Sequence, residues 1–243
     1  MAEPTKIPTA LITGASSGMG ALFADRLAAR GNDLILVARD DAELQAMAER
    51  ISETHAQSIR VLAADLTQPE DLARVESVLR DDPTIEMLVN NAGIGAVAPL
   101  LASDPDQMQR MIALNVTAVT RLVCAAVPRF VARRRGTIVN IASSVALAPE
   151  TLNGVYGASK AFVLTLGRAL EHELADTGVR VQTVLPGATA TPFWARSGAS
   201  PQALDPAIVM TPEDVVDAAL AGLDAGESVT IPSLPDMAAW DAF

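Results

Sequence analysis

Short apolar runs alternate with longer amphipathic segments along almost the whole chain, and this alternation constrains the fold more than any other feature. Strands are predicted at residues 7–13, 33–38, 59–63, 86–89, 137–141, 179–185 and 227–231. Helices are predicted at residues 19–30, 41–53, 104–135, 154–176 and 213–223, and Thr67 is the predicted N-cap of another. This pattern predicts an α/β fold, a doubly wound parallel sheet of about seven strands flanked by helices on both faces.

Length, charge and cysteine content narrow the class of protein. The chain has 243 residues and a net charge of −11, which fits one domain over residues 1–243 and argues against nucleic acid or an anionic membrane as a partner. Residues 1–8 lack the apolar run of a signal peptide, and no uninterrupted apolar stretch reaches membrane-spanning length. The single cysteine, Cys124, lies in an apolar helical stretch and is expected to be a buried, inert thiol. These features predict a cytoplasmic protein without a membrane partner.

A glycine-rich loop follows the first predicted strand and opens the first predicted helix, with the sequence Thr13-Gly14-Ala15-Ser16-Ser17-Gly18-Met19-Gly20. Glycines allow a tight turn and a close approach of the main chain, so that free N–H groups of the helix can point at a pyrophosphate. The spacing is GxxxGxG rather than the general GxGxxG, and a glycine-rich turn alone is a weak signal. Its place between a strand and a helix favours a Rossmann-type dinucleotide site over a simple structural turn.

The end of the second predicted strand bears on the choice of cofactor. An acidic residue there would bind a ribose 2′-hydroxyl and favour NAD(H), but Ala38 takes that place and Arg39 follows it. A guanidinium can pair with a 2′-phosphate, which predicts a preference for NADP(H), with NAD(H) still possible. The alternative is a solvated Arg39 beside Asp40 and Asp41.

Two further strand ends are predicted to lie at the same site, because ligands in doubly wound sheets bind beyond the carboxyl ends of the strands. Asp65, after the third strand, could accept a hydrogen bond from an adenine amino group or could be an ordinary loop residue. The run Asn90-Asn91-Ala92-Gly93 ends the fourth strand. Its small residues would let the main chain pass beside a cofactor, although its asparagines could serve only the turn.

The strongest catalytic signal combines Ser143 with Tyr156 and Lys160. Tyr156 and Lys160 are four positions apart and share one face of a predicted helix. A tyrosine, whose pKa is ordinarily about 10, could exchange a proton near neutral pH if the ammonium lowered that pKa by stabilising the phenolate. Ser143 ends the fifth strand and could donate a hydrogen bond to a developing alkoxide. The alternative is an ordinary amphipathic helix, although Tyr156 is the chain's only tyrosine.

Together, these motifs resemble those of the classical short-chain dehydrogenase/reductase family over nearly the whole chain. The family pattern TGxxxGxG corresponds to residues 13–20, with Met19 where isoleucine is commoner, NNAG corresponds to residues 90–93, and YxxxK to Tyr156 and Lys160. The family's catalytic serine precedes its tyrosine by thirteen positions, which selects Ser143 over Ser144.

The resemblance also implies roles for residues that carry no signal by themselves. Asn115 would hold a water for proton relay, Pro186 and Gly187 would form the family's PG motif, and Thr191 would bind the nicotinamide carboxamide. The predicted catalytic residues are then Asn115, Ser143, Tyr156 and Lys160. The predicted cofactor-binding residues are Gly14, Ser16, Ser17, Gly18, Met19, Gly20, Arg39, Asp65, Leu66, Asn91, Ala92, Gly93, Tyr156, Lys160, Pro186, Gly187, Thr189 and Thr191.

By this resemblance, the chain is expected to be an NADP(H)-dependent oxidoreductase that moves a hydride between the nicotinamide and a small carbonyl or secondary alcohol, with Tyr156 as general acid/base. The predicted substrate contacts are Ser143, Val145, Tyr156 and Phe193, under a lid at about 188–211. No cluster of histidine and cysteine suggests a metal. The resemblance further implies a homodimer or homotetramer, and the stripe of Ala161, Leu164, Leu170 and Leu174 could serve that interface or the core.

The main alternative is a catalytically silent NADP(H)-binding regulatory or scaffold protein of the same fold, because intact catalytic residues do not prove turnover. Enoyl reductases of similar fold have a wider tyrosine–lysine spacing than the four positions found here, which disfavours them.

Overall fold

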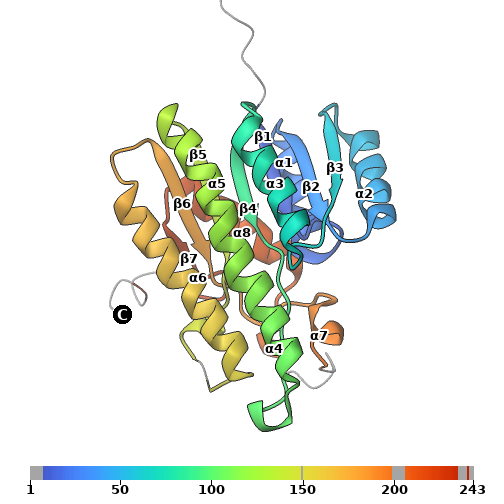
Figure 1. Cartoon of the computed structure of the whole chain (residues 1–243), viewed down its shortest axis with the longest axis vertical. Coiled ribbons are helices and arrows are strands. Elements are labelled where there is room, and N and C mark those ends of the chain that lie inside the picture. Colours follow the sequence, from blue (N-terminus) through green and yellow to red (C-terminus); the bar gives the residue numbers. More distant parts are fainter. Residues whose placement is uncertain (1–7, 149, 199–205, 235–239, 241–243) are drawn as a thin grey trace, which may run out of the picture.

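The computed structural model describes residues 8–148, 150–198, 206–234 and 240. Its centre is a seven-stranded parallel sheet in the order β3-β2-β1-β4-β5-β6-β7 (Figure 1). This order confirms the doubly wound fold, and it places the switch point, where such folds bind ligands, between β1 and β4. The strands are Thr9–Thr13 (β1), Asp33–Ala38 (β2), Ile59–Ala63 (β3), Ile85–Asn90 (β4), Gly136–Ile141 (β5), Val179–Val184 (β6) and Val229–Thr230 (β7).

Helices cover both faces of the sheet, and Figure 1 shows α3, α5 and α6 in front of it. One apolar core joins α1, α2 and α8 to one face, and a second joins α3, α5 and α6 to the other. Burial on both faces explains why the central strands are continuous apolar runs without alternation. The helices are α1 (Gly18–Ala29), α2 (Asp41–Thr54), α3 (Pro69–Asp81), α4 (Pro105–Ile112), α5 (Val119–Ala132), α6 (Gly154–Glu173), α7 (Phe193–Arg196) and α8 (Pro212–Ala225).

The first and last strands of the chain differ from the predicted ones. Ile7, where the first strand was expected to begin, lies outside the described residues, and β1 is assigned from Thr9. The strand predicted at 227–231 is reduced to the two residues of β7, which pair only with Thr183 and Val184 of β6.

The predicted N-cap of α3 is wrong. Gln68 occupies the N-cap position, and Thr67 donates instead to the Asp65 carboxylate, from its N–H at 3.0 Å and its hydroxyl at 2.7 Å. Asp71 in turn accepts the N–H of Asp65 at 2.8 Å. A turn closed by the Asp65 side chain therefore precedes the helix, and it fixes Asp65 at the end of β3.

A single 28-residue helix, Pro105–Ala132, comprises α4, a π-helical turn at Ala113–Ala118 and α5. The π turn contains the buried Asn115, and such turns are frequent at functional sites. By length and composition this helix could cross a membrane, although polar residues such as Asn115 and Arg121 interrupt its apolar stretch. Core helices of globular folds pass the same test, and this one packs against α3 and the sheet.

Helices α5 and α6 bear on two further predictions, the burial of Cys124 and the role of the leucine stripe. Cys124 is exposed on α5, so the predicted burial of its thiol is wrong; its neighbours Val123 and Ala125 face the core instead. On α6, Leu164 and Leu170 are buried, and so is Leu174 just after it. These three leucines of the predicted stripe therefore serve the core.

Candidate active site

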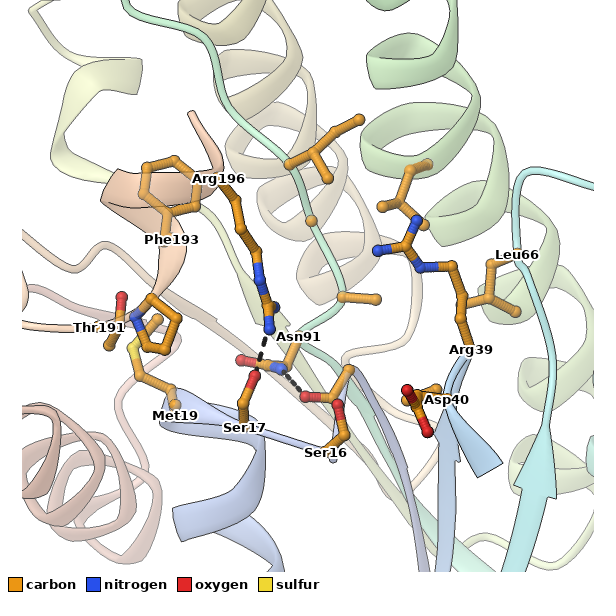
Figure 2. Close-up of a pocket in the computed structure, with 18 of the residues that line it drawn as sticks. Ser16, Ser17, Met19, Arg39, Asp40, Leu66, Asn91, Thr191, Phe193 and Arg196 are labelled. Atoms are coloured by element: carbon orange, nitrogen blue, oxygen red, sulfur yellow. Dashed lines mark hydrogen bonds between the residues drawn. The ribbon is translucent and has the colours of Figure 1, made fainter. Parts of the chain in front are cut away.

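A cleft of about 530 Å³ lies beyond the carboxyl ends of the strands on either side of the switch point, between the start of α1 and α7 (Figure 2). Its volume lies in the usual range of small-molecule sites, roughly 300–1,000 Å³. The structure thus brings together predicted cofactor residues from five separate segments, namely Gly14, Ser16, Ser17, Gly18, Met19, Arg39, Asp65, Leu66, Asn91, Ala92, Gly93 and Thr191.

The glycine loop forms a cradle that side chains would fill. Gly14 and Gly18 have φ angles of 66° and 56°, which glycine adopts at little cost. A Cβ on Gly14 would lie 2.8 Å from Nδ2 of Asn91, and a Cβ on Gly20 would collide with the Gly14 carbonyl. Ser17, the N-cap residue of α1, makes no side-chain capping bond. The first N–H groups of α1 are therefore available to the phosphates of a dinucleotide.

Asn91 ties two loops of the cleft together. Its Nδ2 donates to the carbonyl oxygens of Thr13 at 2.9 Å and Gly14 at 3.2 Å. The hydroxyl of Thr13 accepts the N–H groups of Asn91 and Ala92, both at 3.0 Å. The side-chain amide thus serves the turn, one of the two roles that the sequence left open, while the residue still lines the cleft.

Arg39 faces the cleft from the end of β2 (Figure 2). The neighbouring Asp40 caps α2, with its carboxylate accepting the N–H of Glu43 at 3.0 Å. Within the described ranges no ion pair of Arg39 is found. Its guanidinium is therefore available to an anionic ligand in the cleft.

Four predicted catalytic residues, Asn115, Ser143, Tyr156 and Lys160, are all buried beside the cleft. The hydroxyl of Ser143, at the end of β5, hydrogen-bonds the Tyr156 phenol. It also lies 3.4 Å from the carbonyl oxygen of Pro186, to which it can donate. Pro186, a predicted cofactor residue, thus offers an acceptor to Ser143, the predicted catalytic serine.

Burial shifts the pKa values of the Tyr156 phenol and the Lys160 ammonium. It raises the pKa of Tyr156 to about 12, and the hydrogen bond from Ser143 offsets only part of that effect. Burial also lowers the pKa of Lys160 to about 8. The lowering of the phenol pKa by the ammonium together with an oxidised nicotinamide therefore stays a prediction, since in this structure the phenol pKa is raised. The physical reason is desolvation, which disfavours the charged form of both groups.

Asn115 is held by a network that includes a residue the sequence did not single out, Ser159. The Oδ1 of Asn115 accepts the N–H of Ile94 at 3.0 Å, and its Nδ2 donates to the Ile94 carbonyl at 2.9 Å and to Oγ of Ser159 at 3.0 Å. Ser159 itself donates to the main-chain carbonyl of Tyr156 at 2.8 Å. Its position three residues after Tyr156 on one helix was the available signal.

An apolar cluster adjoins the phenol on the substrate side. Val145, Tyr156 and Phe193, three predicted substrate contacts, pack there with Met108 and Met111. The rings of Tyr156 and Phe193 have centroids 5.6 Å apart at an angle of 44°. Phe193 belongs to α7, within the predicted lid at 188–211, of which residues 199–205 lie outside the described residues.

Six predicted cofactor residues do not line the cleft: Gly20, Tyr156, Lys160, Pro186, Gly187 and Thr189. Gly20 packs under the Gly14 carbonyl, and Thr189 is buried with its carbonyl oxygen accepting the indole N–H of Trp194 at 2.7 Å. The cleft instead includes Arg196, which the sequence pattern did not indicate. Its spacing of three residues from Phe193 on α7 was the only signal.

Comparisons with known proteins show which family the chain resembles. Residues 8–202 match the family described as short chain dehydrogenase. An uncharacterized oxidoreductase from Staphylococcus saprophyticus is 32% identical over 225 residues, which are 91% of this chain and 93% of that protein. Human 17-beta-hydroxysteroid dehydrogenase type 3 is 34% identical over 186 residues, which are 75% of this chain and 59% of that enzyme.

Two solved structures are similar over the whole fold. A short-chain dehydrogenase from Sphingobium yanoikuyae in complex with NADPH has a TM-score of 0.94 and 49% identity, over 97% of this chain and 92% of that one. The bulky-bulky ketone specific alcohol dehydrogenase from Comamonas testosteroni has a TM-score of 0.90 and 45% identity, over 98% of this chain and 91% of that one. From the family match, these relatives and the glycine loop beside the buried serine, tyrosine and lysine, the chain belongs to the short-chain dehydrogenase/reductase family of oxidoreductases.

Proposed function

We propose that this protein is an NADP(H)-dependent oxidoreductase that interconverts a carbonyl compound and a secondary alcohol, with Tyr156 as general acid/base. The observation that carries the proposal is the buried cluster of Ser143, Tyr156 and Lys160 beside a cleft built for a dinucleotide. The NADPH in the similar Sphingobium structure supports the phosphorylated cofactor, and so does Arg39, which lines the cleft and has no ion pair among the described residues.

A nicotinamide dinucleotide, when bound, supplies or accepts the hydride. The glycine loop and the first N–H groups of α1 would hold its pyrophosphate, Arg39 its 2′-phosphate and Thr191 its carboxamide. Gly93 keeps the main chain close to the catalytic groups, because a Cβ there would lie 3.5 Å from Nζ of Lys160 and 3.3 Å from Oδ1 of Asn115.

The chain's own groups move the proton. Because burial raises the pKa of Tyr156 to about 12, the phenol is protonated at neutral pH, which is the form that reduction of a carbonyl requires. Tyr156 donates this proton to the carbonyl oxygen, while the hydroxyl of Ser143 stabilises the developing negative charge on the same oxygen. The Lys160 ammonium then stabilises the phenolate that remains. In alcohol oxidation the same proton moves the opposite way.

The apolar cluster beside Tyr156 supports a hydrophobic ketone or secondary alcohol as substrate. Phe193, Val145 and Met111 offer no charged or hydrogen-bonding group to a polar substrate chain. The Comamonas relative, described as specific for bulky-bulky ketones, favours the same class.

We further propose that the protein is a cytoplasmic homodimer or homotetramer. Two large apolar side chains on neighbouring helices support a protein interface there, Ile112 of α4 with 45% exposure and Phe162 of α6 with 39%.

A panel of ketones and secondary alcohols tests the reaction, run with NADPH/NADP⁺ and with NADH/NAD⁺ on the wild type and on Tyr156→Phe. We expect faster turnover with the phosphorylated cofactor, and a loss of roughly 10²- to 10⁴-fold in the variant with NADPH binding retained. Equal turnover by Tyr156→Phe would contradict the acid/base assignment. A wild type that binds NADPH but turns over no member of the panel would indicate the catalytically silent alternative.

A further inference from the structure

Arg196, the last residue of α7, reaches across the cleft to the start of α1. Its Nη1 donates to Oγ of Ser17 at 3.4 Å, and Figure 2 shows the side chain extending from α7 toward that hydroxyl. Ser17 precedes the uncapped N–H groups of α1, where a dinucleotide pyrophosphate fits. Arg39 lies on the other side of this cleft in the same view.

Among the described residues, no carboxylate neutralises the Arg196 guanidinium. Arg26 and Arg30, on the outer part of α1 and just after it, each pair with a carboxylate at 2.8 Å, whereas no ion pair of Arg196 occurs in the described part of the chain. The carboxylates of Asp40 and Asp65, which line the cleft, accept hydrogen bonds from other groups. On a chain of net charge −11, an anionic ligand needs local cations of this kind.

The short helix that carries Arg196 also carries Phe193, whose ring lies 5.6 Å from the Tyr156 ring. The two ends of this helix are linked firmly. Ser197 donates from its hydroxyl to the Phe193 carbonyl at 2.7 Å, and Trp194 is buried with its indole bonded to Thr189. A contact that fixes Arg196 therefore also fixes Phe193.

We propose that Arg196 binds the pyrophosphate of the cofactor, and that this contact holds Phe193 in place beside Tyr156. The inference rests on the proposed function, because it needs a dinucleotide in the cleft. Arg196 would thus bind phosphate from α7, the helix that also carries Phe193 of the proposed substrate pocket. Since the cofactor's phosphates then help to complete the substrate pocket, cofactor and substrate should each raise the affinity for the other.

Nucleotide fragments separate the two arginines of the cleft. The wild type, Arg196→Ala, Arg196→Lys and Arg39→Ala are titrated by calorimetry with NADPH, NADH, ADP-ribose, which carries the pyrophosphate, and 2′-AMP, which carries only the 2′-phosphate. Arg196→Ala should weaken NADPH, NADH and ADP-ribose alike, by about tenfold or more, and leave 2′-AMP unchanged. Arg39→Ala should weaken NADPH and 2′-AMP only, and Arg196→Lys should restore part of the ADP-ribose affinity.

Arg180→Ala is the matched control for net charge, because Arg180 lies near the start of β6, at the opposite end of the sheet from the cleft. In Arg196→Ala we also expect a higher KM for the ketone at saturating NADPH, with kcat little changed. Unchanged ADP-ribose affinity, or weakening confined to NADPH and 2′-AMP, would overturn the pyrophosphate assignment. An unchanged ketone KM would overturn the link to Phe193. If the wild type itself bound none of the nucleotides, the proposed function would fail instead.

Discussion

The Nζ of Lys160 lies 5.9 Å from the centroid of the Tyr156 ring and donates a 2.8 Å hydrogen bond to the main-chain carbonyl oxygen of Ile141. The Lys160 ammonium of α6 is thus held at Ile141, the last residue of β5, and Ser143 follows two positions later. This contact joins sheet and helix at the proposed catalytic centre. The lysine is placed beside the phenol without being bonded to it, and both groups are buried.

The buried lysine predicts a pH dependence of stability. Because its pKa falls from 10.5 to about 8 on burial, the unfolded chain binds this proton more tightly than the folded one between those values. The free energy of unfolding should therefore rise with pH from 8 to 10, by up to about 1.4 kcal/mol per unit, and Lys160→Met should lack this rise. Urea unfolding at several pH values measures both slopes.

Tyr156→Phe is the control for that series. Tyr156 stays largely protonated in both states below about pH 9, so this variant should retain the rise seen in the wild type up to that pH. Parallel curves for the wild type and Lys160→Met would show that Lys160 does not titrate in this window.

Arg39 should determine the preference between the two cofactors. Loss of a charge-assisted hydrogen bond to the 2′-phosphate costs roughly 1.5–3 kcal/mol, so Arg39→Ala should raise the KM for NADPH by roughly tenfold or more while that for NADH changes little. Initial rates at one fixed ketone concentration measure both constants. Equal changes for the two cofactors would mean that the 2′-phosphate is bound elsewhere.

Ser159 should act as a positioning residue through Asn115 and Tyr156. Ser159→Ala removes the hydroxyl that accepts from Asn115 and donates to the Tyr156 carbonyl, which leaves the buried Asn115 amide short of a partner. We expect kcat to fall by roughly tenfold, with the substrate KM and NADPH affinity little changed and the pH profile of kcat shifted. Ser159→Thr keeps the hydroxyl and should restore part of kcat. A fall in thermal stability alone, with normal kcat, would limit Ser159 to a structural role.

Gly95 should control the position of Phe193. A Cβ at Gly95 would collide with the Phe193 ring, so Gly95→Ala should displace that ring and raise the ketone KM several-fold. Because α7 links Phe193 to Arg196, the same variant should also weaken NADPH binding. Gly154→Ala is the matched control, since a Cβ there meets nothing within 4 Å. Equal kinetics for the two variants would show that Phe193 does not shape the substrate pocket.

Much of this protein could be predicted locally. The apolar runs fixed the sheet and its doubly wound arrangement, because a parallel strand buried on both faces needs no alternation. The conformation of the glycine loop could also be predicted, since the positive φ angles of Gly14 and Gly18 are favourable for glycine and rare for other residues. Both features depend on residues that are close together in the sequence, so the sequence alone is enough to predict them.

Tertiary structure alone decided the features that depend on distant residues. Cys124 is exposed because the face of a helix that is buried depends on where the sheet lies. Arg196 contacts Ser17, which is 179 positions away in the sequence. The pKa values of Tyr156 and Lys160 followed from burial rather than from their spacing on α6, because desolvation depends on everything packed around a group. Sequence by itself thus determined the fold and most of the residues of the cleft, while three-dimensional packing determined the pKa values of Tyr156 and Lys160 and brought α7 to the cofactor cleft.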